Sequence, residues 1–119
     1  MSEHIGVLNI GGVLLVALPS DLNETAVASL QEELSAQVVE KGAHGVLDDI
    51  TGVQVVDTCV GGGLSVIACV ARLLGAHPVL VGIRPGVAQT LVQLGVELND
   101  LPRTRDLDAG LLALGIRST

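Results

Sequence analysis

Short apolar runs alternate with longer amphipathic segments along the chain, and this alternation restricts the fold more than any other sequence feature. Strands are expected at residues 5–10, 13–18, 45–50 and 79–83, with a short edge strand at 96–98. The first two runs flank Gly11-Gly12, a pair typical of a hairpin turn. Strands alternating with helices predict an α/β domain. We expect a mostly parallel, four- to five-stranded sheet, opened by an N-terminal β-hairpin and covered by about four helices.

Helix start and stop signals define the segments between these strands. The first helix is expected over residues 22–41, with Ser20 or Asp21 as its cap and Gly42 as its end. Asp57 is expected to cap a second helix over residues 58–74. A third helix follows over residues 85–94, and Thr104 is expected to cap the last one.

Composition excludes several classes of function. Phe, Tyr and Trp are absent, so the core must be built from aliphatic side chains, and at 49% hydrophobic residues the chain has enough of them. Thirteen acidic against six basic side chains give a net charge of −7, which argues against nucleic acid and anionic membranes as partners. Because no apolar run could span a bilayer and no signal-peptide pattern is visible, we expect a cytoplasmic protein.

Residues 55–63, VVDTCVGGG, place an acid, a hydroxyl, a thiol and three glycines together. A phosphate-binding loop needs a lysine after its glycines, but the one lysine of the chain, Lys41, precedes them. Cys59 and Cys69 are ten residues apart on one expected helix, too far for a disulfide. The three histidines lack metal-ligand spacing. The sequence therefore predicts no enzyme activity, no metal and no cofactor.

Helical spacing divides the segment 58–74 into two faces. The residues expected to face the core are Val60, Leu64, Ile67, Ala71 and Leu74. The opposite stripe is small or weakly polar and consists of Thr58, Gly62, Ser65, Cys69 and Arg72. Since a face without bulky side chains allows close approach, we expect this stripe and Asp57 to bind a partner protein. The alternative is that the glycines only let the helix pack closely on its own sheet.

The position of Thr58 favours modification by phosphate. A phosphate at a helix N-terminus meets the positive end of the helix dipole, so the fold would tolerate it. It would also add about −1.5 to −2 charges to a nearly neutral face, which is a plausible switch. The alternative for Thr58 is simple helix capping.

The whole chain resembles the STAS domain family, in particular the RsbS-like scaffolds of the stressosome. The resemblance rests on the hairpin, the first helix and three stretches: GAHGVLDDITGVQVVDT (42–58), LLGAHPVLVGIRPGVAQTLVQLGVEL (73–98) and DLDAGL (106–111). Its most specific elements are an Asp-Ser/Thr pair at the start of the second helix and a strand followed by Gly-Ile-Arg/Gln-Pro. The resemblance implies one STAS domain over residues 1–119.

The resemblance also implies a function without catalysis. RsbS-like proteins co-assemble with RsbR-like STAS proteins into a large shell that holds an RsbT-like switch serine/threonine kinase. On stress, the kinase phosphorylates the hydroxyl that follows the Asp and leaves, and an RsbX-like phosphatase resets the system. Carried over, the phosphoacceptor is Thr58, where such proteins usually have Ser. We expect a homodimer that joins a large hetero-assembly.

Two alternative functions stay open. A free anti-sigma-factor antagonist would bind an anti-sigma kinase and be phosphorylated after the same Asp. A domain that binds a small phosphate or nucleotide ligand would use Gly61–Gly63.

Two further residues are singled out. Arg84 follows a strand whose end should lie on the same sheet edge as Thr58, so we expect it to contact a phosphate there, against the alternative of a solvated loop arginine. Asp48 departs from the apolar residue usual at this position of such proteins, and we expect it on the exposed side of the strand end.

Overall fold

A five-stranded sheet forms the centre of the molecule, with its strands in the order β1-β2-β3-β4-β5. The computed structural model describes residues 6–54, 56–95 and 103–115. The strands are β1 (Val7–Ile10), β2 (Val13–Ala17), β3 (Gly45–Asp49), β4 (His77–Val81) and β5 (Arg103–Thr104). β1 pairs antiparallel with β2, and every later neighbour pairs in parallel. The predicted hairpin and mostly parallel sheet are confirmed.

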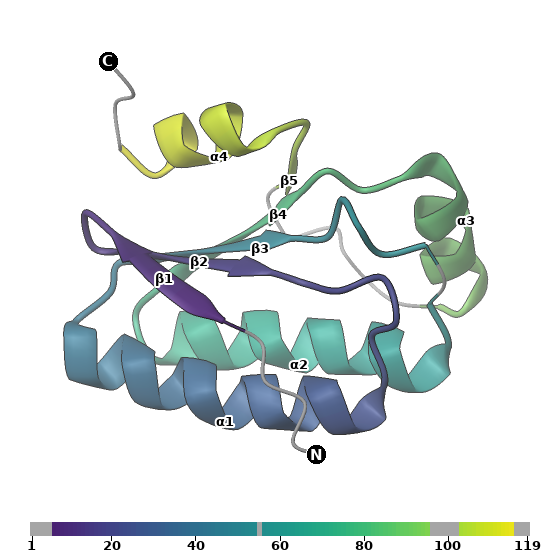
Figure 1. Ribbon diagram of the computed structural model, residues 1–119, viewed down its shortest axis with the longest axis horizontal. Helices are drawn as coiled ribbons and strands as arrows, with labels where there is room; N and C mark the ends of the chain where they lie inside the picture. The colour runs from purple at the N-terminus through teal and green to yellow at the C-terminus, as the bar shows by residue number, and fades with distance from the viewer. Residues whose placement is uncertain (1–5, 55, 96–102, 116–119) are drawn as a thin grey trace.

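Four helices surround the sheet unequally (Figure 1). α1 (Glu24–Lys41) and α2 (Thr58–Leu73) lie side by side on one face and begin at the same end of it, whereas α4 (Leu107–Ala113) covers the other face. α3 (Pro85–Gln93) stands beyond the carboxyl ends of the strands. The loops after β3 and β4 therefore lie at one end of the molecule, together with the first turns of α1, α2 and α3.

The core has two parts because strand side chains alternate between the two faces of the sheet. The larger part packs the sheet against α1 and α2 and includes Leu14, Val16, Leu30, Val46, Ile67 and Leu80. The smaller part comprises Val13, Leu47, Val79 and Val81, against which leucines of α4 pack. Aliphatic residues supply both parts, as the absence of aromatic side chains requires.

Two helix caps differ from the sequence-based expectation. Asn23, rather than Ser20 or Asp21, caps α1, and its Oδ1 accepts a hydrogen bond from Ala26 N at 2.9 Å. The reason is the preceding Leu22, which is buried in the same cluster as Val27, the fourth helical residue; such a pair fixes where the chain enters a helix.

At the last helix, Asp106 is the cap instead of Thr104, and its Oδ1 accepts from Ala109 N at 2.9 Å. Thr104 cannot start the helix because it belongs to β5 and pairs with Val81.

Strand positions also differ at the far edge of the sheet. β4 begins two residues earlier than expected, at His77, and ends before Gly82, whose φ of +74° breaks the extended backbone. The edge strand predicted at residues 96–98 lies outside the described residues. The described edge strand is the two-residue β5, too short to be recognised from an alternating pattern.

Asp48 corrects a prediction more sharply, because its side chain is buried rather than exposed. It is 2% exposed, and its register neighbours Val16 and Leu80 both belong to the larger core. The carboxyl Oδ1 has no hydrogen-bond partner among the described residues. Burial raises the pKa of Asp48 to about 7, since removing a carboxylate from water disfavours its charged form. β3 thus carries an acid in the middle of an aliphatic core.

Candidate functional site

The predicted phosphoacceptor is the first residue of α2 and is exposed. Thr58 follows Asp57, which has an extended backbone and caps the helix, with its Oδ1 accepting a hydrogen bond from Val60 N at 2.8 Å. Asp57 therefore has the capping role, which confirms one expectation and removes simple capping as the explanation for Thr58. Within the described part of the chain, the Thr58 hydroxyl makes no hydrogen bond that would restrain it.

The loop that delivers Asp57 and Thr58 is anchored in the core. Ile50, Val53 and Val56 are buried, with exposures of 0%, 0% and 5%. Ile50 N donates to the carbonyl oxygen of Val81 at 3.0 Å, and Thr51 N donates to Oδ1 of Asp49 at the same distance. These buried side chains and hydrogen bonds fix the position of the loop that leads to α2. The exposed hydroxyl of Thr58 therefore follows a well-anchored segment.

Arg84 lies at the same end of the sheet, as expected from the parallel topology. Its Nε donates to the carbonyl oxygen of Thr51 at 2.7 Å, which joins the loop after β4 to the loop after β3. Arg84 is nevertheless exposed, so the alternative of a solvated loop arginine stays open. A contact between Arg84 and a phosphate on Thr58 stays a prediction, because the hydrogen bond observed is to backbone.

The stripe predicted to bind a partner is largely accessible. Thr58, Gly62, Cys69 and Arg72 are exposed and Ser65 is half-buried. The opposite face is buried as expected at Val60, Leu64, Ile67 and Ala71, but Leu74 is 41% exposed, since α2 ends before it.

Sequence reasoning missed two apolar members of the outer face of α2. Val66 is 49% exposed and Leu73 is 81% exposed. Both lie four residues after a stripe residue, Gly62 and Cys69 respectively, a spacing that was available in the sequence. The outer face of α2 is therefore more apolar than the stripe alone indicated.

The three consecutive glycines have three different surroundings. Gly61 is buried. A Cβ on Gly63 would collide with the Val27 side chain of α1, so this glycine permits the close approach of the two helices. A Cβ on Gly62 would meet nothing within 4 Å. Close packing therefore explains Gly63 but not Gly62.

This contrast predicts opposite effects of two alanine substitutions. Gly62→Ala is expected to raise the free energy of unfolding by about 1 kcal/mol, because alanine favours the helix and meets no neighbour. Gly63→Ala gains the same propensity but overpacks against Val27, a cost of about 1–3 kcal/mol, so the two variants should differ by about 2 kcal/mol. Urea denaturation measures both. Equal gains in the two variants would contradict the packing described here.

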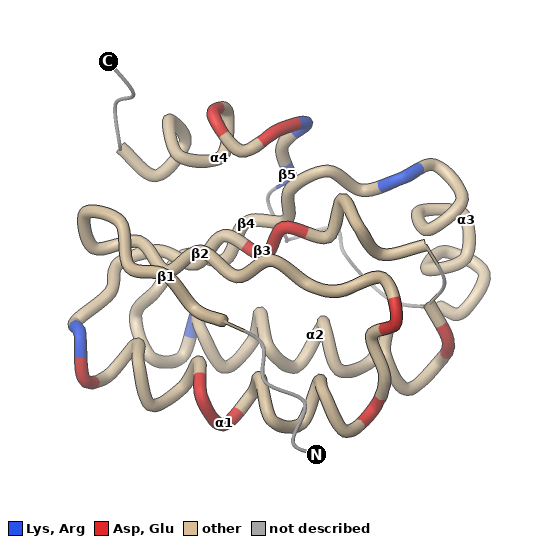
Figure 2. Tube along the Cα trace, viewed as in Figure 1, with Lys and Arg blue, Asp and Glu red and all other residues tan. Residues whose placement is uncertain are grey.

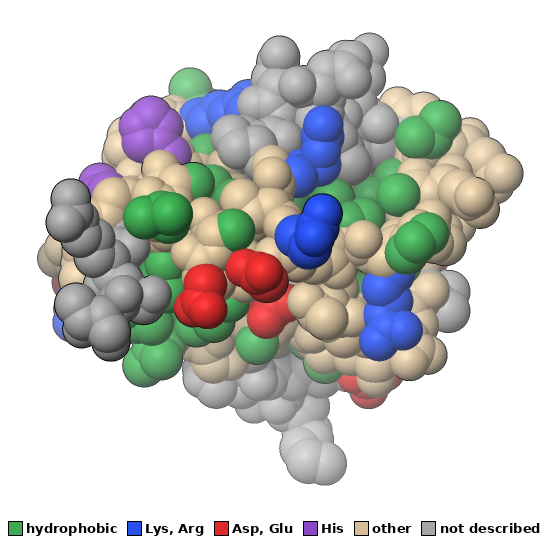
Figure 3. Space-filling model, turned by 90° about the horizontal axis from the view of Figure 1, so that it is seen from above, with side chains coloured by type: hydrophobic (Ala, Val, Ile, Leu, Met, Phe, Trp, Pro, Cys, Tyr) green, Lys and Arg blue, Asp and Glu red, His purple; other side chains and the backbone are tan. Residues whose placement is uncertain are grey.

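Charge is distributed unevenly between the paired helices. α2 carries a single charged residue, Arg72, whereas α1 carries several acidic ones (Figure 2). Seen from the side of α4, acidic and basic side chains lie close together near the centre of the face (Figure 3). That face therefore carries charges of both signs, whereas a phosphate on Thr58 would be added to a helix with a single charged residue.

A family model decides the relationship of this chain to known proteins: the model of the STAS domain matches residues 4–106. The chain belongs to the STAS family. Among curated STAS proteins it is 35% identical over 99 residues to the RsbT co-antagonist protein RsbRA of Bacillus subtilis (strain 168), covering 83% of this chain but 36% of that protein. The chain thus spans about a third of the length of this relative.

Solved STAS structures agree with this assignment. An RsbS of Moorella thermoacetica, in a serine-to-glutamate variant, superposes with a TM-score of 0.85 at 32% identity, covering 95% of this chain and 96% of that one. A chain of the stressosome, described as a signal integration and transduction hub, gives 0.83 at 33% identity, covering 92% and 96%. The chain is thus a relative of stressosome and anti-sigma-antagonist STAS proteins. None of its described helices has the length and apolarity to cross a membrane.

Proposed function

We propose that this chain is a non-catalytic scaffold of a cytoplasmic stressosome. It co-assembles with RsbR-like STAS proteins, holds an RsbT-like switch kinase, and releases that kinase when Thr58 is phosphorylated. An RsbX-like phosphatase reverses the modification. The observation that carries the proposal is the exposed Thr58 hydroxyl at the first position of α2, unneeded for capping because Asp57 supplies the cap.

The chemistry of the position supports phosphorylation without unfolding. The unpaired backbone N–H groups and the dipole of α2 favour an anion at its N-terminus, so a phosphate there stabilises the helix end. At the same time the phosphate changes a face on which Gly62, Val66 and Cys69 are exposed and uncharged. A partner bound to that face would meet a dianion in place of a hydroxyl, and its affinity would fall.

Similarity to an RsbS protein supports the choice of residue. The serine replaced by glutamate in the Moorella thermoacetica RsbS carries the number 58 in a chain matched over 96% of its length. Threonine retains the hydroxyl and adds a methyl group, so we expect Thr58 to be modified more slowly than serine.

A free anti-sigma-factor antagonist is the second candidate, because the antagonist SpoIIAA has the same fold, at 10% identity and a TM-score of 0.71. The higher identities to RsbS and RsbRA favour the assembly. Particle size separates the two functions: mixing with an RsbR-like protein should give a large particle only for the scaffold.

The test of the proposed function is phosphorylation by the RsbT-like kinase of the same organism. With ATP, the wild-type chain should gain one phosphate on Thr58, located by intact mass and fragment mapping. Thr58→Ala should gain none yet still bind the kinase, and Thr58→Ser should react faster than wild type. If the wild-type chain neither binds the kinase nor gains a phosphate, the stressosome function is wrong.

A further inference from the structure

A surface hollow of about 270 Å³ opens between the first turns of α1 and α2, beside Thr58. Its lining residues are Glu24, Val27, Ala28 and Gln31 of α1 and Cys59 and Gly63 of α2. Cys59 directly follows Thr58. A protein that reaches the Thr58 hydroxyl therefore comes near this hollow, which we call the α1–α2 hollow.

The opening is local to this end of the helix pair. Farther along the same seam, the space lined by Leu34, Val38, Ile67 and Ala71 has a volume of about 10 Å³, room for no more than one water. At the Thr58 end neither Ala28 nor Gly63 carries a side chain large enough to fill the seam, although Val27 lies so close to Gly63 that a Cβ there would collide with it. Of these two places on the seam, the one next to the phosphoacceptor has room for a side chain.

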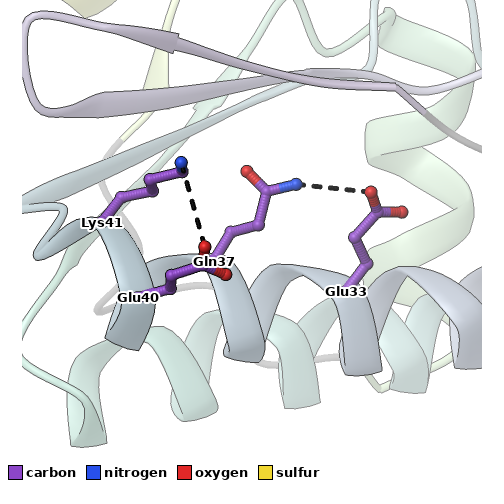
Figure 4. A network of polar contacts seen from close by, with 4 residues as sticks. All are labelled: Glu33, Gln37, Glu40 and Lys41. Atoms are coloured by element: carbon purple, nitrogen blue, oxygen red, sulfur yellow. Dashed lines mark hydrogen bonds and ion pairs between the residues drawn. The ribbon is translucent and has the colours of Figure 1, made fainter.

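Glu24 makes the hollow chemically selective. It is exposed, and no ion pair or hydrogen bond links its carboxylate to any described residue. Two other glutamates of α1 have partners: Glu33 Oε1 accepts from Gln37 Nε2 at 3.3 Å, and Glu40 lies 4.0 Å from Lys41 Nζ (Figure 4). Glu32 has none among the described residues, but it lies outside the hollow. No basic residue lines the hollow, and the whole chain carries −7. The complementary side chain is therefore a cation.

We infer that the α1–α2 hollow receives an arginine or lysine side chain of the kinase that acts on Thr58, an inference that rests on the proposed function. The aliphatic stem lies along Val27 and Ala28, and the charged head reaches Glu24 and the amide oxygen of Gln31. The carboxylates of Glu24 and Asp57 offset the partial positive charges of the two helix N-termini. The contact sets the position of the kinase relative to the hydroxyl.

The test compares charge and size variants of the hollow with matched variants elsewhere on α1. Glu24→Lys is expected to weaken kinase binding at least 100-fold and Glu24→Gln about tenfold, whereas Glu32→Lys, at an exposed position outside the hollow, should change it less than threefold. Ala28→Leu fills the hollow and should weaken binding tenfold, whereas Ala36→Leu, exposed on a later turn, should not. Biolayer interferometry gives the affinities, and thermal melting checks that every variant is folded.

The outcomes separate this inference from the proposed function. If the wild-type chain binds the kinase and is phosphorylated on Thr58, but Glu24→Lys and Ala28→Leu bind as tightly as their controls, the hollow is not the contact and the scaffold function stands. If all charge variants of α1 weaken binding equally, attraction is diffuse and the inference fails. Loss confined to the Glu24 and Ala28 variants establishes the contact.

Discussion

Asp48→Val is expected to stabilise the domain by about 4 kcal/mol at pH 8. The wild-type side chain is buried between Val16 and Leu80 in an aliphatic core, and burial raises its pKa to about 7 from an ordinary value of 3.8. That difference of about three pH units corresponds to about 4 kcal/mol, because each unit is worth about 1.4 kcal/mol. Valine removes both the charge and the unpaired oxygen.

The sign of the pH dependence follows from which state holds the proton. Between about pH 4 and pH 7 the folded protein keeps Asp48 protonated, whereas the unfolded chain has released that proton. The free energy of unfolding contributed by this residue therefore falls as pH rises through this window and is constant above it. Urea denaturation at pH 5, 6, 7 and 8 should show the difference between Asp48→Val and wild type growing with pH.

Two controls accompany this experiment. Asp48→Asn removes the charge but keeps an unpaired polar group. Its stability relative to Asp48→Val should therefore be the same at every pH, and it should stabilise the domain less than valine does. Asp49→Asn changes the half-buried neighbour, whose Oδ1 accepts a hydrogen bond from Thr51 N. This variant should not raise the free energy of unfolding at any pH. A wild-type protein whose stability relative to Asp48→Val is the same at pH 5 and pH 8 would contradict the burial of an ionisable carboxyl.

Gly82→Ala is the second substitution with a large expected effect, a loss of about 3 kcal/mol. Gly82 has a φ of +74°, where alanine costs about 1 kcal/mol. In addition, a Cβ at this position would collide with Oγ1 of Thr51, the residue whose carbonyl holds Arg84. Repacking that contact supplies the remainder of the cost.

The chain offers a control for each part of this cost. Gly75→Ala tests conformation alone, because Gly75 has a φ of +88° and a Cβ there would meet nothing within 4 Å, so about 1 kcal/mol should be lost. Thr51→Gly removes the colliding atoms, and in that background Gly82→Ala should cost no more than Gly75→Ala. Equal costs of Gly82→Ala with and without Thr51 would show that the collision plays no part. The double-mutant cycle is measured by urea denaturation.

Sequence patterns predicted most of this fold because its long elements obey simple periodicities. The hairpin turn, α2 with its Asp57 cap, and the meeting of the loops before Thr58 and Arg84 all followed from local signals and parallel topology. Ser20, Asp21 and Asn23 are all good capping residues within four positions of the chain, and local preference could not rank them because the burial of Leu22 decides between them.

The prediction that Asp48 is exposed was wrong for a related reason. An acid at a strand end is ordinarily exposed, and its burial depends on α1 and α2 closing over the strand, which no local pattern reports. At the candidate site, the residues of α2 were predictable from spacing. The α1–α2 hollow was not, because it depends on how two helices distant in sequence lie side by side.

The unequal cover of the sheet matters for anyone choosing where to end a recombinant version of this domain. The family model stops at residue 106, the residue that caps α4. Gly110 of α4 lies against Leu47 and Val81, and the leucines of that helix pack on the smaller part of the core. A chain cut at the family boundary would therefore present a bare aliphatic sheet surface to water. Such a surface promotes self-association, and aggregates formed in this way would be easily mistaken for assembly.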